Sequence, residues 1–517
     1  MGLKLSSFFC LFVLFGLVYA IIFAIGIWFN WSLWLMIGLT IGIILLQYLL
    51  GPYIINWLYK INWISYDQFK AQYPYLAAVV DKVVSIRGIK TPRMGIIKDG
   101  NPNAFTFGHT KNNARIVITS GILEYLDEKE QQAVLAHELG HVVHNDFILM
   151  TLVFAIPLLI LTIARWCYYA SRGAFQSSDD EGMGAAIGAT LIVIAALSYV
   201  AYFISYLVSL IISRIREYYA DEHAAELTED PNALSTALVK IAYGLLMQAN
   251  IEKKSNSRTR ALRGLGIFDS RGAEALAVAS MSNSKKYSKE AIQASAAWDL
   301  FNPWAKYYQL FSTHPLPAKR IMRLNHQCEI YGIKPEIDFS YARKLKEEQA
   351  GKSMIDEFLF DLFMKLLPIL LFVLLIIATL IWIFGVAGLI TIAPNIWTFE
   401  FLIFLWGTGL MIIGVGMLIK ASFKYKKDFK YERVLELVTN VKVSPIRTVP
   451  AIIKGKIVGK GIPGYFLSED LYFQDETGFM YIDYRSGIPF GDFFFAIARV
   501  KKLIGQNVII TGWYRRG

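Results

Sequence analysis

Long, uncharged apolar stretches alternate with polar segments along this chain, and they set its predicted organisation. Six stretches are long enough to cross a hydrocarbon layer of about 30 Å as helices that rise about 1.5 Å per residue. The predicted spans are Ser7–Phe29, Leu33–Tyr59, Phe147–Tyr168, Ala185–Ile212, Leu366–Ile392 and Phe399–Leu418. The first stretch is too long for the apolar part of a signal peptide, so we expect it to be retained as a span.

The polar segments predict a soluble domain that one pair of spans divides into two halves. Residues 60–146 contain an amphipathic helix and short strand-like pieces, whereas residues 214–364 are mostly helical in pattern. The predicted order is two transmembrane helices in 1–59, the first half of the domain in 60–146, two transmembrane helices in 147–213, the second half in 214–364, two transmembrane helices in 365–420, and a basic juxtamembrane segment with a β-rich domain in 421–517.

The last part of the chain has a different pattern from the rest. Short strand-like pieces with glycine-containing turns between them follow from about Val438 to Gly517. Such a pattern is typical of a small β-barrel, here predicted to be OB-like. An OB-like barrel can bind nucleic acid, but a fold of this kind does not decide function, and a regulatory or partner-binding role is the simpler expectation.

Composition and charge favour a membrane surface over nucleic acid. The chain is 55% hydrophobic and only 18% charged, against about 25% charged residues in soluble domains. The net charge is +11, and residues 420–517 alone hold 17 Lys and Arg against 9 Asp and Glu. Six basic residues lie between Lys420 and Arg433, directly after a predicted span. This placement suits anionic lipid, and no nucleic-acid partner is expected.

Basic residues near the span ends predict the orientation. The turns at 30–32 and 391–399 contain no Lys or Arg, whereas Lys60, Arg214 and the 420–433 cluster all lie at the opposite ends of the spans. Because Lys and Arg are enriched on the cytoplasmic side, we expect both termini and the soluble domain to be cytoplasmic. The chain is therefore predicted to be an integral protein of the plasma (cytoplasmic) membrane.

The candidate chemistry lies in the segment Ala136-His137-Glu138-Leu139-Gly140-His141. In a helix, His137 and His141 lie one turn apart on the same face, so both imidazoles can bind one Zn²⁺. Glu138 can then act as base on a water molecule that the metal activates. The pattern alone could be an exposed helix turn, but a stretch of membrane length begins directly after Asp146, and we expect the helix that begins near Glu128 to run on into it. The three cysteines are scattered, which leaves histidines and carboxylates as ligands.

Two histidines leave zinc without a third protein ligand. The candidates are Glu217, Asp221, Glu222, His223 and His314. Glu217 follows the fourth span by about one turn and would emerge beside the HExxH helix if the third and fourth spans form an antiparallel pair, which favours it as the ligand. Asp221 lies one turn further and could accept a hydrogen bond from a ligand histidine. Alternatively, both carboxylates are surface partners of Arg214 and Arg216.

Four motifs in this order closely resemble those of the HtpX-type membrane zinc endopeptidases, with the type I CAAX prenyl proteases as more distant relatives. They are Asn103-Ala104-Phe105, His137-Glu138-Leu139-Gly140-His141, Ser213-Arg214-Ile215-Arg216-Glu217-Tyr218-Tyr219-Ala220-Asp221, and Ser312-Thr313-His314-Pro315 with Arg320-Ile321. The resemblance covers about residues 60–330. It implies a gluzincin site with Glu217 as third ligand, a cytoplasmic catalytic domain, and cleavage of misfolded or unneeded membrane proteins. Two further spans and the β-rich tail depart from the common four-span pattern, which leaves substrate and regulation open.

Further site residues are expected around this centre. By the resemblance, Asn103, Ala104 and Phe105 belong to an edge strand that pairs with the substrate backbone, although an ordinary hairpin strand would show the same pattern. The candidates for supporting the metal site or the transition state are Asp221, His314, Arg320 and Asp146. His314 and Arg320 could hold the tetrahedral oxyanion or a buried carboxylate.

The resulting prediction is a polytopic α-helical membrane protein of about six spans, with a mainly helical, zincin-like catalytic domain bearing a small sheet and with a C-terminal OB-like β-barrel. One Zn²⁺ per chain, held by His137, His141 and Glu217, would support hydrolysis of peptide bonds in membrane or misfolded proteins, with Glu138 as general base and then acid. Two alternatives are a CAAX-type site-specific processing protease and an inactive membrane scaffold whose C-terminal domain binds partners.

Overall fold

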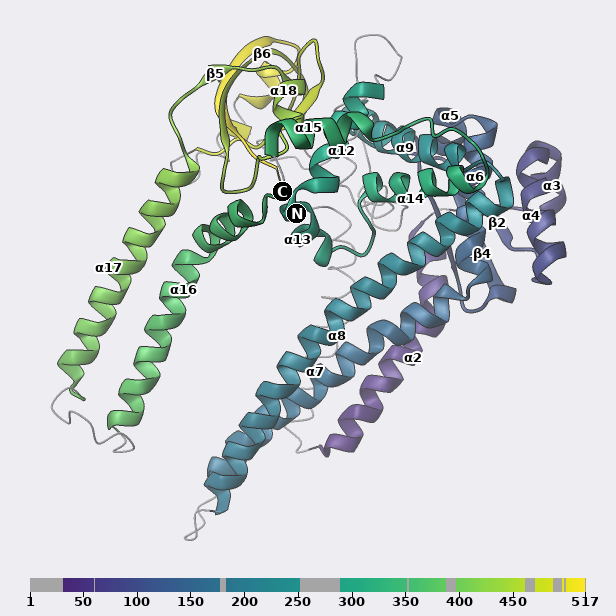
Figure 1. The fold of residues 1–517 in the computed structure, drawn as a ribbon. Coiled ribbons are helices and arrows are strands. Elements are labelled where there is room, and N and C mark those ends of the chain that lie inside the picture. Colours follow the sequence, from purple (N-terminus) through teal and green to yellow (C-terminus); the bar gives the residue numbers. More distant parts are fainter. Residues whose placement is uncertain are drawn as a thin grey trace.

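The computed structural model of the chain describes residues 31–59, 61–176, 183–251, 289–350, 353–386, 397–460, 470–486, 495–496 and 499–516. Helices dominate, and two small sheets lie at the same end of the long apolar helices (Figure 1). The two halves of the soluble domain and the β-rich tail therefore share one side of the membrane-crossing part.

Five helices of the described residues are long and apolar enough to cross a membrane. They are α2 (Leu33–Leu58), α7 (Asp146–Gln176), α8 (Met183–Thr228), α16 (Ile355–Val386) and α17 (Phe399–Lys424). Five of the six predicted spans are thus found, and they indicate an integral membrane protein. The predicted first span, Ser7–Phe29, lies outside the described residues.

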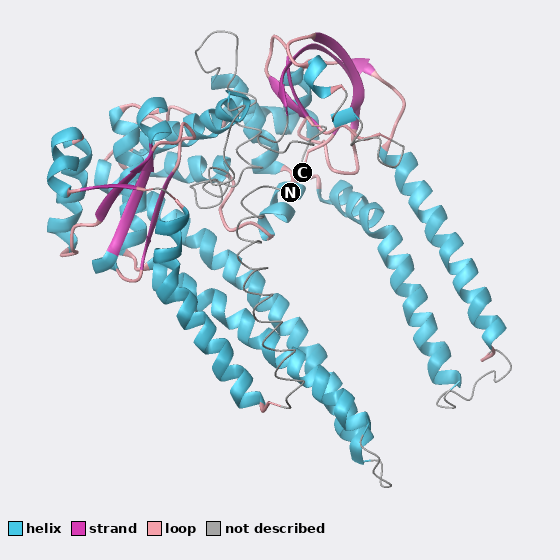
Figure 2. Ribbon diagram, turned by 180° about the vertical axis from the view of Figure 1, so that it is seen from behind, coloured by secondary structure: helices cyan, strands magenta, loops and turns pink. Residues whose placement is uncertain are grey.

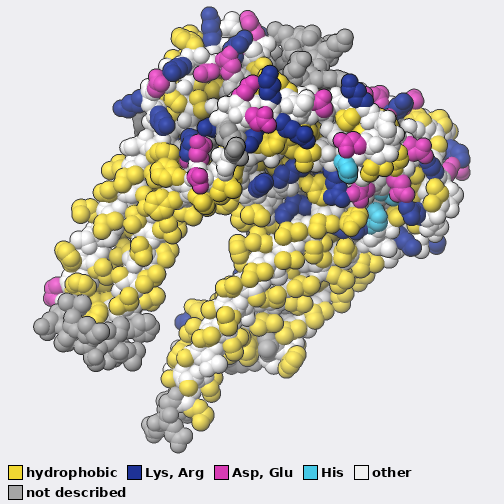
Figure 3. Space-filling view, in the orientation of Figure 1, with side chains coloured by type: hydrophobic (Ala, Val, Ile, Leu, Met, Phe, Trp, Pro, Cys, Tyr) yellow, Lys and Arg dark blue, Asp and Glu magenta, His cyan; other side chains and the backbone are white. Residues whose placement is uncertain are grey.

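These helices form two groups that stand apart at their far ends, α2 with α7 and α8, and α16 with α17 (Figures 1 and 2). Within the first group, the Ser209 hydroxyl of α8 donates to the Val153 carbonyl of α7 at 2.8 Å. In the second group, a Cβ at Gly409 or Gly416 would lie 2.6 Å from a side-chain atom of Leu375 or Leu371, so glycine permits the close approach of α17. Large apolar side chains cover both groups on their outer faces (Figure 3).

The first half of the soluble domain carries a four-stranded sheet. Its elements are β1 (Asn62–Ile64), α3 (Tyr66–Gln72), α4 (Pro74–Arg87), β2 (Arg93–Ile97), β3 (Ala104–Gly108), the short 3-10 helix at Lys111–Asn113, β4 (Ala114–Thr119), α5 (Ser120–Tyr125) and α6 (Glu128–Val143). The strand order is β1-β2-β4-β3, with β2 and β4 parallel and the other pairs antiparallel. Strand β3 therefore forms an edge of this sheet.

The second half adds helices that complete the same core. They are α9 (Pro231–Ile251), α12 (Lys289–Phe301), α13 (Pro303–Leu310), α14 (Pro317–Ile330) and α15 (Ser340–Ala350). Leu139 of α6, Ala224 of α8, Leu238 of α9 and Ile321 of α14 are all buried in one cluster. Burial of side chains from both halves in a common core joins segments that a pair of membrane helices separates in sequence.

The HExxH helix does not run on into the third span, and the expectation of one continuous helical stretch is wrong. Helix α6 ends at Val143 and α7 begins at Asp146. Between them, Asn145 has a φ of 56°, in the left-handed region that asparagine adopts more readily than most residues. The chain therefore turns at the membrane boundary, and α6 is free to follow a direction different from that of α7. By contrast, α8 is a single helix that carries Glu217 beyond its apolar part.

The described strands of the tail form an open sheet. The elements are β5 (Lys430–Tyr431), α18 (Val434–Val438), β6 (Val449–Lys460), β7 (Leu471–Gln474), β8 (Phe479–Ile482), α20 (Val500–Leu503) and β9 (Asn507–Tyr514). The long β6 pairs with β5 and β7 on its path through the sheet and also with β9. A small β-rich unit is present as predicted, whereas closure into an OB-like barrel is not shown by these strands.

The tail is attached to the soluble domain through α12. The Trp298 indole donates to the Val443 carbonyl at 2.7 Å, and the Asn302 side-chain amide donates to the Val441 carbonyl at 2.7 Å. Arg516, in the last described stretch, lies 3.1 Å from the buried Asp299 carboxylate. The β-rich unit is therefore held by hydrogen bonds and an ion pair to α12 and to Asn302, the residue that caps α13.

The turn at Asn145 yields a stability prediction. Asn145→Val should lower the melting temperature of the purified protein, because a left-handed backbone costs about 1–2 kcal/mol more for a residue with a branched Cβ. Asn145→Gly, which adopts positive φ freely, should melt near the parent. The measurement is thermal unfolding in detergent; equal melting temperatures for the two variants would contradict the assigned backbone conformation.

Candidate metal centre

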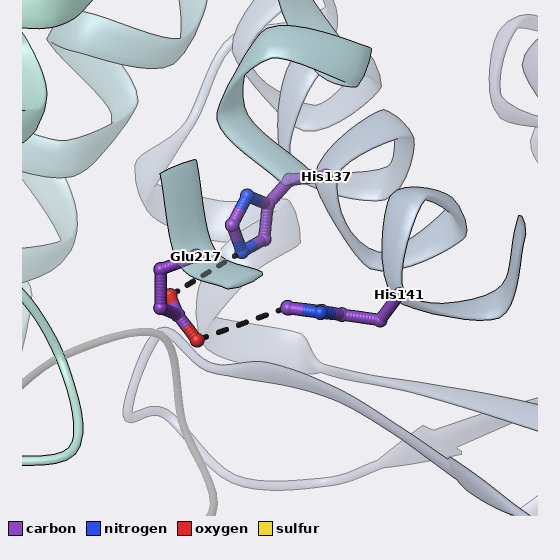
Figure 4. Close-up of side chains that lie close together, drawn as sticks. All are labelled: His137, His141 and Glu217. Carbon is purple, nitrogen blue, oxygen red and sulfur yellow. Dashed lines mark ion pairs between the residues drawn. The ribbon is translucent and has the colours of Figure 1, made fainter. Parts of the chain in front are cut away.

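Two crossing helices bring the three predicted ligands together. His137 and His141 project from α6 and Glu217 from α8, and their ligand atoms all lie within 4.8 Å of one another (Figure 4). The His137 Nε2 atom is 3.8 Å from Glu217 Oε2, and the His141 Nε2 atom is 3.9 Å from Glu217 Oε1. The helices can approach because α6 has a glycine at the crossing: a Cβ on Gly140 would lie 3.0 Å from the Cα of Ala220.

A carboxylate fixes the orientation of each imidazole. Asp221 Oδ1 lies 3.0 Å from His137 Nδ1, and Asp146 Oδ2 lies 2.7 Å from His141 Nδ1. Since a carboxylate only accepts hydrogen bonds, both Nδ1 atoms carry a proton, which leaves the two Nε2 atoms, on the side of Glu217, as the atoms that can bind a metal. Such carboxylate–histidine pairs are the usual support of a metal-binding histidine.

Arginines hold the two supporting carboxylates. The fully buried Arg320 donates to both oxygens of Asp221, at 2.9 and 2.6 Å, and its Nη1 lies 3.5 Å from Glu217 Oε2. Arg216 pairs with Asp146. The alternative in which Glu217 and Asp221 are surface partners of the α8 arginines does not describe this arrangement, because both carboxylates are buried and face α6 and α14.

The electrostatics of this site suit a cation. Burial lowers the pKa of His141, but the hydrogen bond to Asp146 and the charges of Glu217 and Glu138 outweigh it and raise the pKa to about 9. The pKa of Arg320 is also raised, because the Asp221 and Glu217 carboxylates outweigh the effect of burial. Glu217 Oε2 is buried and accepts no hydrogen bond. Arg320 Nη1 lies 3.5 Å from this oxygen, and the Nε2 atoms of His137 and His141 each face one oxygen of the same carboxylate, an arrangement that fits a divalent cation with nitrogen and oxygen ligands.

The predicted base, Glu138, has a partner that the sequence analysis missed. The carboxylate is 3% exposed, and the Thr106 hydroxyl of β3 donates to its Oε2 at 2.6 Å. Strand alternation places Thr106 on the face of β3 opposite to Phe105 and Phe107. A single polar side chain in an otherwise apolar strand suggested that Thr106 has a buried polar partner. The sequence could not identify that partner, because it depends on the packing of β3 against α6.

The predicted edge strand lies at the edge of its sheet and beside the helix that carries His137, Glu138 and His141. Ala104 and Phe105 begin β3, which in the described sheet pairs with β4 alone. Asn103 precedes the strand and is buried; its backbone N–H donates to Thr119 Oγ1 at 2.8 Å. The open side of β3 and the Thr106 contact to Glu138 belong to the same strand, so a peptide added at this edge would lie next to the HExxH helix.

The remaining candidates divide into those near the metal cluster and those away from it. His314 Nδ1 lies 3.0 Å from Glu217 Oε1, so His314 and Arg320 both contact a buried carboxylate. Glu222 instead pairs with Arg323, and the His223 ring contacts the Ala136 carbonyl. The loop that carries His314 is held from α8, because Arg214 Nη1 donates to the Ser312 carbonyl at 2.7 Å.

Comparisons with known proteins agree with this geometry. The sequence profile described as "Peptidase family M48" matches residues 70–328. A protein of Methanothermobacter thermautotrophicus named "Protease HtpX homolog" is 42% identical over 244 residues, which cover 47% of this chain and 87% of that protein. A protein of the same name from Thermoplasma acidophilum is 30% identical over 320 residues, covering 60% of this chain and 91% of that protein.

Among solved structures, the crystal structure of S. mikatae Ste24p is similar over 62% of this chain and 65% of that chain, with 16% identity and a TM-score of 0.36. At that TM-score the likeness supports no conclusion about this chain. The matched region of the profile spans the HExxH helix, the Glu217 helix and the helix of Arg320. With the profile match and the extended identity to HtpX homologues, this membrane protein belongs to peptidase family M48 and is a metalloprotease.

Proposed function

We propose that the protein is a zinc-dependent endopeptidase whose one zinc ion per chain is held by His137, His141 and Glu217. The observation that carries the proposal is the arrangement of three ligand atoms within 4.8 Å, with both histidines oriented through Nδ1 by carboxylates. Two imidazoles and one carboxylate with room for a further ligand are the donor set of catalytic rather than structural zinc. When bound, zinc supplies a Lewis acid that polarises the scissile carbonyl and makes water acidic near neutral pH.

The side chains of the chain itself supply the proton transfers. We assign Glu138 as the general base that takes a proton from the attacking water and returns it to the leaving amine. Thr106 occupies Oε2 of Glu138, which leaves Oε1 to face the reacting water. Asp146, Asp221 and Arg320 keep the ligands in place, and the contact of His314 with Glu217 favours a role in holding that carboxylate over a direct role at the oxyanion.

The substrate class follows from the position of the site. The open edge of β3 offers backbone N–H and C=O groups to an extended peptide without reading its side chains, through Asn103, Ala104 and Phe105. Such a mode suits misfolded or unneeded membrane proteins better than one fixed cleavage sequence. The two functions can be separated by offering the same preparation a prenylated CAAX peptide and an unfolded membrane protein. Cleavage of the unfolded protein indicates removal of misfolded proteins, and cleavage of the peptide indicates site-specific processing.

We further propose that the soluble domain and both termini face the cytoplasm in the plasma membrane, from the basic residues at the inner span ends. Helices α7 and α8 return the chain to the side it left, so the proposed catalytic halves at 60–146 and 214–364 would share that side. We also propose that the tail closes into an OB-like barrel and that this barrel can bind partners. A complete site in a metalloprotease family argues against an inactive scaffold.

Glu138→Gln tests the assigned base. The variant should keep about one zinc per chain but lose activity by about 10²–10⁴-fold or more, because the amide cannot take the water proton. The measurement is cleavage of an unfolded membrane protein together with metal analysis of the same preparation. Proteolysis at the parental rate in a preparation free of other proteases would remove Glu138 from this role.

Glu217→Ala tests the ligand set. Bound zinc should fall far below one per chain, since two imidazoles remain in a site that normally uses three protein ligands. Glu222→Ala is the matched control, because Glu222 lies on the same helix but pairs with Arg323 away from the cluster, and it should keep its zinc. Full zinc occupancy in Glu217→Ala would move the third ligand to another residue.

Thr106→Val tests the newly found partner of Glu138. Loss of a hydrogen bond to a charged group should lower kcat by about 10-fold, with KM nearly unchanged. Thr106→Ser should restore most of the rate because it keeps the hydroxyl. Steady-state kinetics on a peptide substrate give kcat and KM separately. An increase in KM with an unaltered kcat would instead show that Thr106 affects substrate binding at β3 and not the action of Glu138.

A further inference from the structure

Four basic side chains border α13, the short helix that lies where α8 and α16 join the soluble domain (Figure 1). They come from four different helices: Arg214 from α8, Lys306 from α13, Lys319 from α14 and Lys365 from α16. None of them belongs to the metal centre. Their convergence on one short helix is not required by the proteolytic chemistry, and it needs an explanation of its own.

Two of these cations are hydrogen-bonded to a single residue of α13, and a third lies one turn away. Arg214 Nη1 donates to the Gln309 carbonyl at 2.6 Å, and the Lys319 ammonium donates to the Gln309 side-chain oxygen. Lys306 lies three residues before Gln309, on the same face of α13, and its side chain is exposed. On the other side, Lys365 Nζ lies 4.8 Å from the ring centre of Trp304.

Among the described residues, Asp299 is the acid that acts on the positive charge of this group. Burial and the charges of Lys306 and Arg214, opposed by Asp299, together lower the pKa of Lys319 to about 8. Asp299 itself is bound by Arg516 at 3.1 Å, so its charge is already shared with another cation. An anion placed between Arg214, Lys306 and Lys319 would therefore be attracted by all three.

The location points to lipid as the source of that anion. Arg214 directly follows the apolar part of α8. In Figure 3, Lys and Arg side chains gather at the top of the space between the two groups of apolar helices. This is the level of the bilayer headgroups, where anionic lipids attract basic side chains.

We propose that Arg214, Lys306 and Lys319 form a binding site for the phosphate of an anionic phospholipid headgroup. The site is coupled to the metal centre through one residue: Arg214 also donates to the Ser312 carbonyl at 2.7 Å, and His314, two residues on, lies 3.0 Å from Glu217. A bound headgroup thus steadies the loop that contacts the proposed zinc ligand. Its effect on activity rests on the proposed function, whereas lipid binding does not.

The binding test uses the full chain in detergent, with phosphatidylglycerol retention followed by native mass spectrometry. Lys306→Gln should weaken retention by about fivefold and Lys306→Gln with Lys319→Gln by about 25-fold, from the usual contribution of each basic residue at an anionic surface. The matched control is Lys344→Gln, an exposed lysine on α15, which should bind as the parent does. Parental retention in Lys306→Gln and in the double variant would overturn the proposal.

Two further arms identify the source of the phosphate and the link to activity. Inorganic phosphate should compete only weakly with phosphatidylglycerol; equal affinity for the free ion would overturn the lipid assignment. In nanodiscs, parental activity should be higher with phosphatidylglycerol than with phosphatidylcholine alone, and the double variant should lose that difference while keeping its zinc. The activity of the double variant on an acidic substrate is measured in both lipids. If it falls by the same factor in phosphatidylglycerol and in phosphatidylcholine, the site binds substrate and the lipid proposal is wrong.

Discussion

The close crossing of α6 and α8 is the constraint on which the rest of this structure depends. Gly140 and Ala220 meet at a distance that leaves no room for a larger side chain, and that contact sets the separation of His137 and His141 from Glu217. Both helices continue into, or abut, membrane spans: α8 is one helix with its span, and α6 meets α7 through the turn at Asn145. The bilayer therefore acts on the centre through the pair α7 and α8, whose packing fixes where the two ligand helices emerge.

The buried charges at this crossing are compatible with a stable fold because they have oppositely charged or hydrogen-bonding partners. Asp221 accepts hydrogen bonds from Nε and Nη2 of Arg320, and Asp146 contacts His141 and Arg216. Removing one partner from such a network leaves an uncompensated buried charge, which costs more than the pair itself contributes. Within the described residues Glu217 Oε2 accepts no hydrogen bond and has Arg320 Nη1 at 3.5 Å, so a cation between the two Nε2 atoms would give it a second positive partner. The same carboxylates orient the two imidazoles and give the centre the negative charge that suits a bound cation.

Periodicity and motif spacing predicted a large part of this arrangement, for identifiable reasons. An apolar stretch of membrane length has few alternatives to a helix, and the i, i+4 spacing of His137 and His141 fixes a shared face whatever surrounds it. The turn at Asn145 was missed because a single left-handed residue leaves no trace in hydrophobic periodicity. Thr106 and the roles of Arg214 and Arg216 depend on which elements pack together, and a one-dimensional pattern does not contain that information. Barrel closure of the tail was inferred from strand spacing alone, which does not determine how the first and last strands pair.

The tail and α16 both pack against the helices that precede the loop of His314. Trp298 and Trp304 form one apolar cluster with Val443 from the tail and are packed by Phe358 from α16. Helix α13, which carries Trp304, leads directly into the loop of His314, and Arg214 holds that loop from α8. A displacement of α16 or of the β-rich unit would therefore reach Glu217 through a short chain of packed and hydrogen-bonded groups. Because α13 is also where the basic side chains gather, the proposed lipid site, the contact with the tail and the start of the loop that carries His314 all lie at the same eight-residue helix.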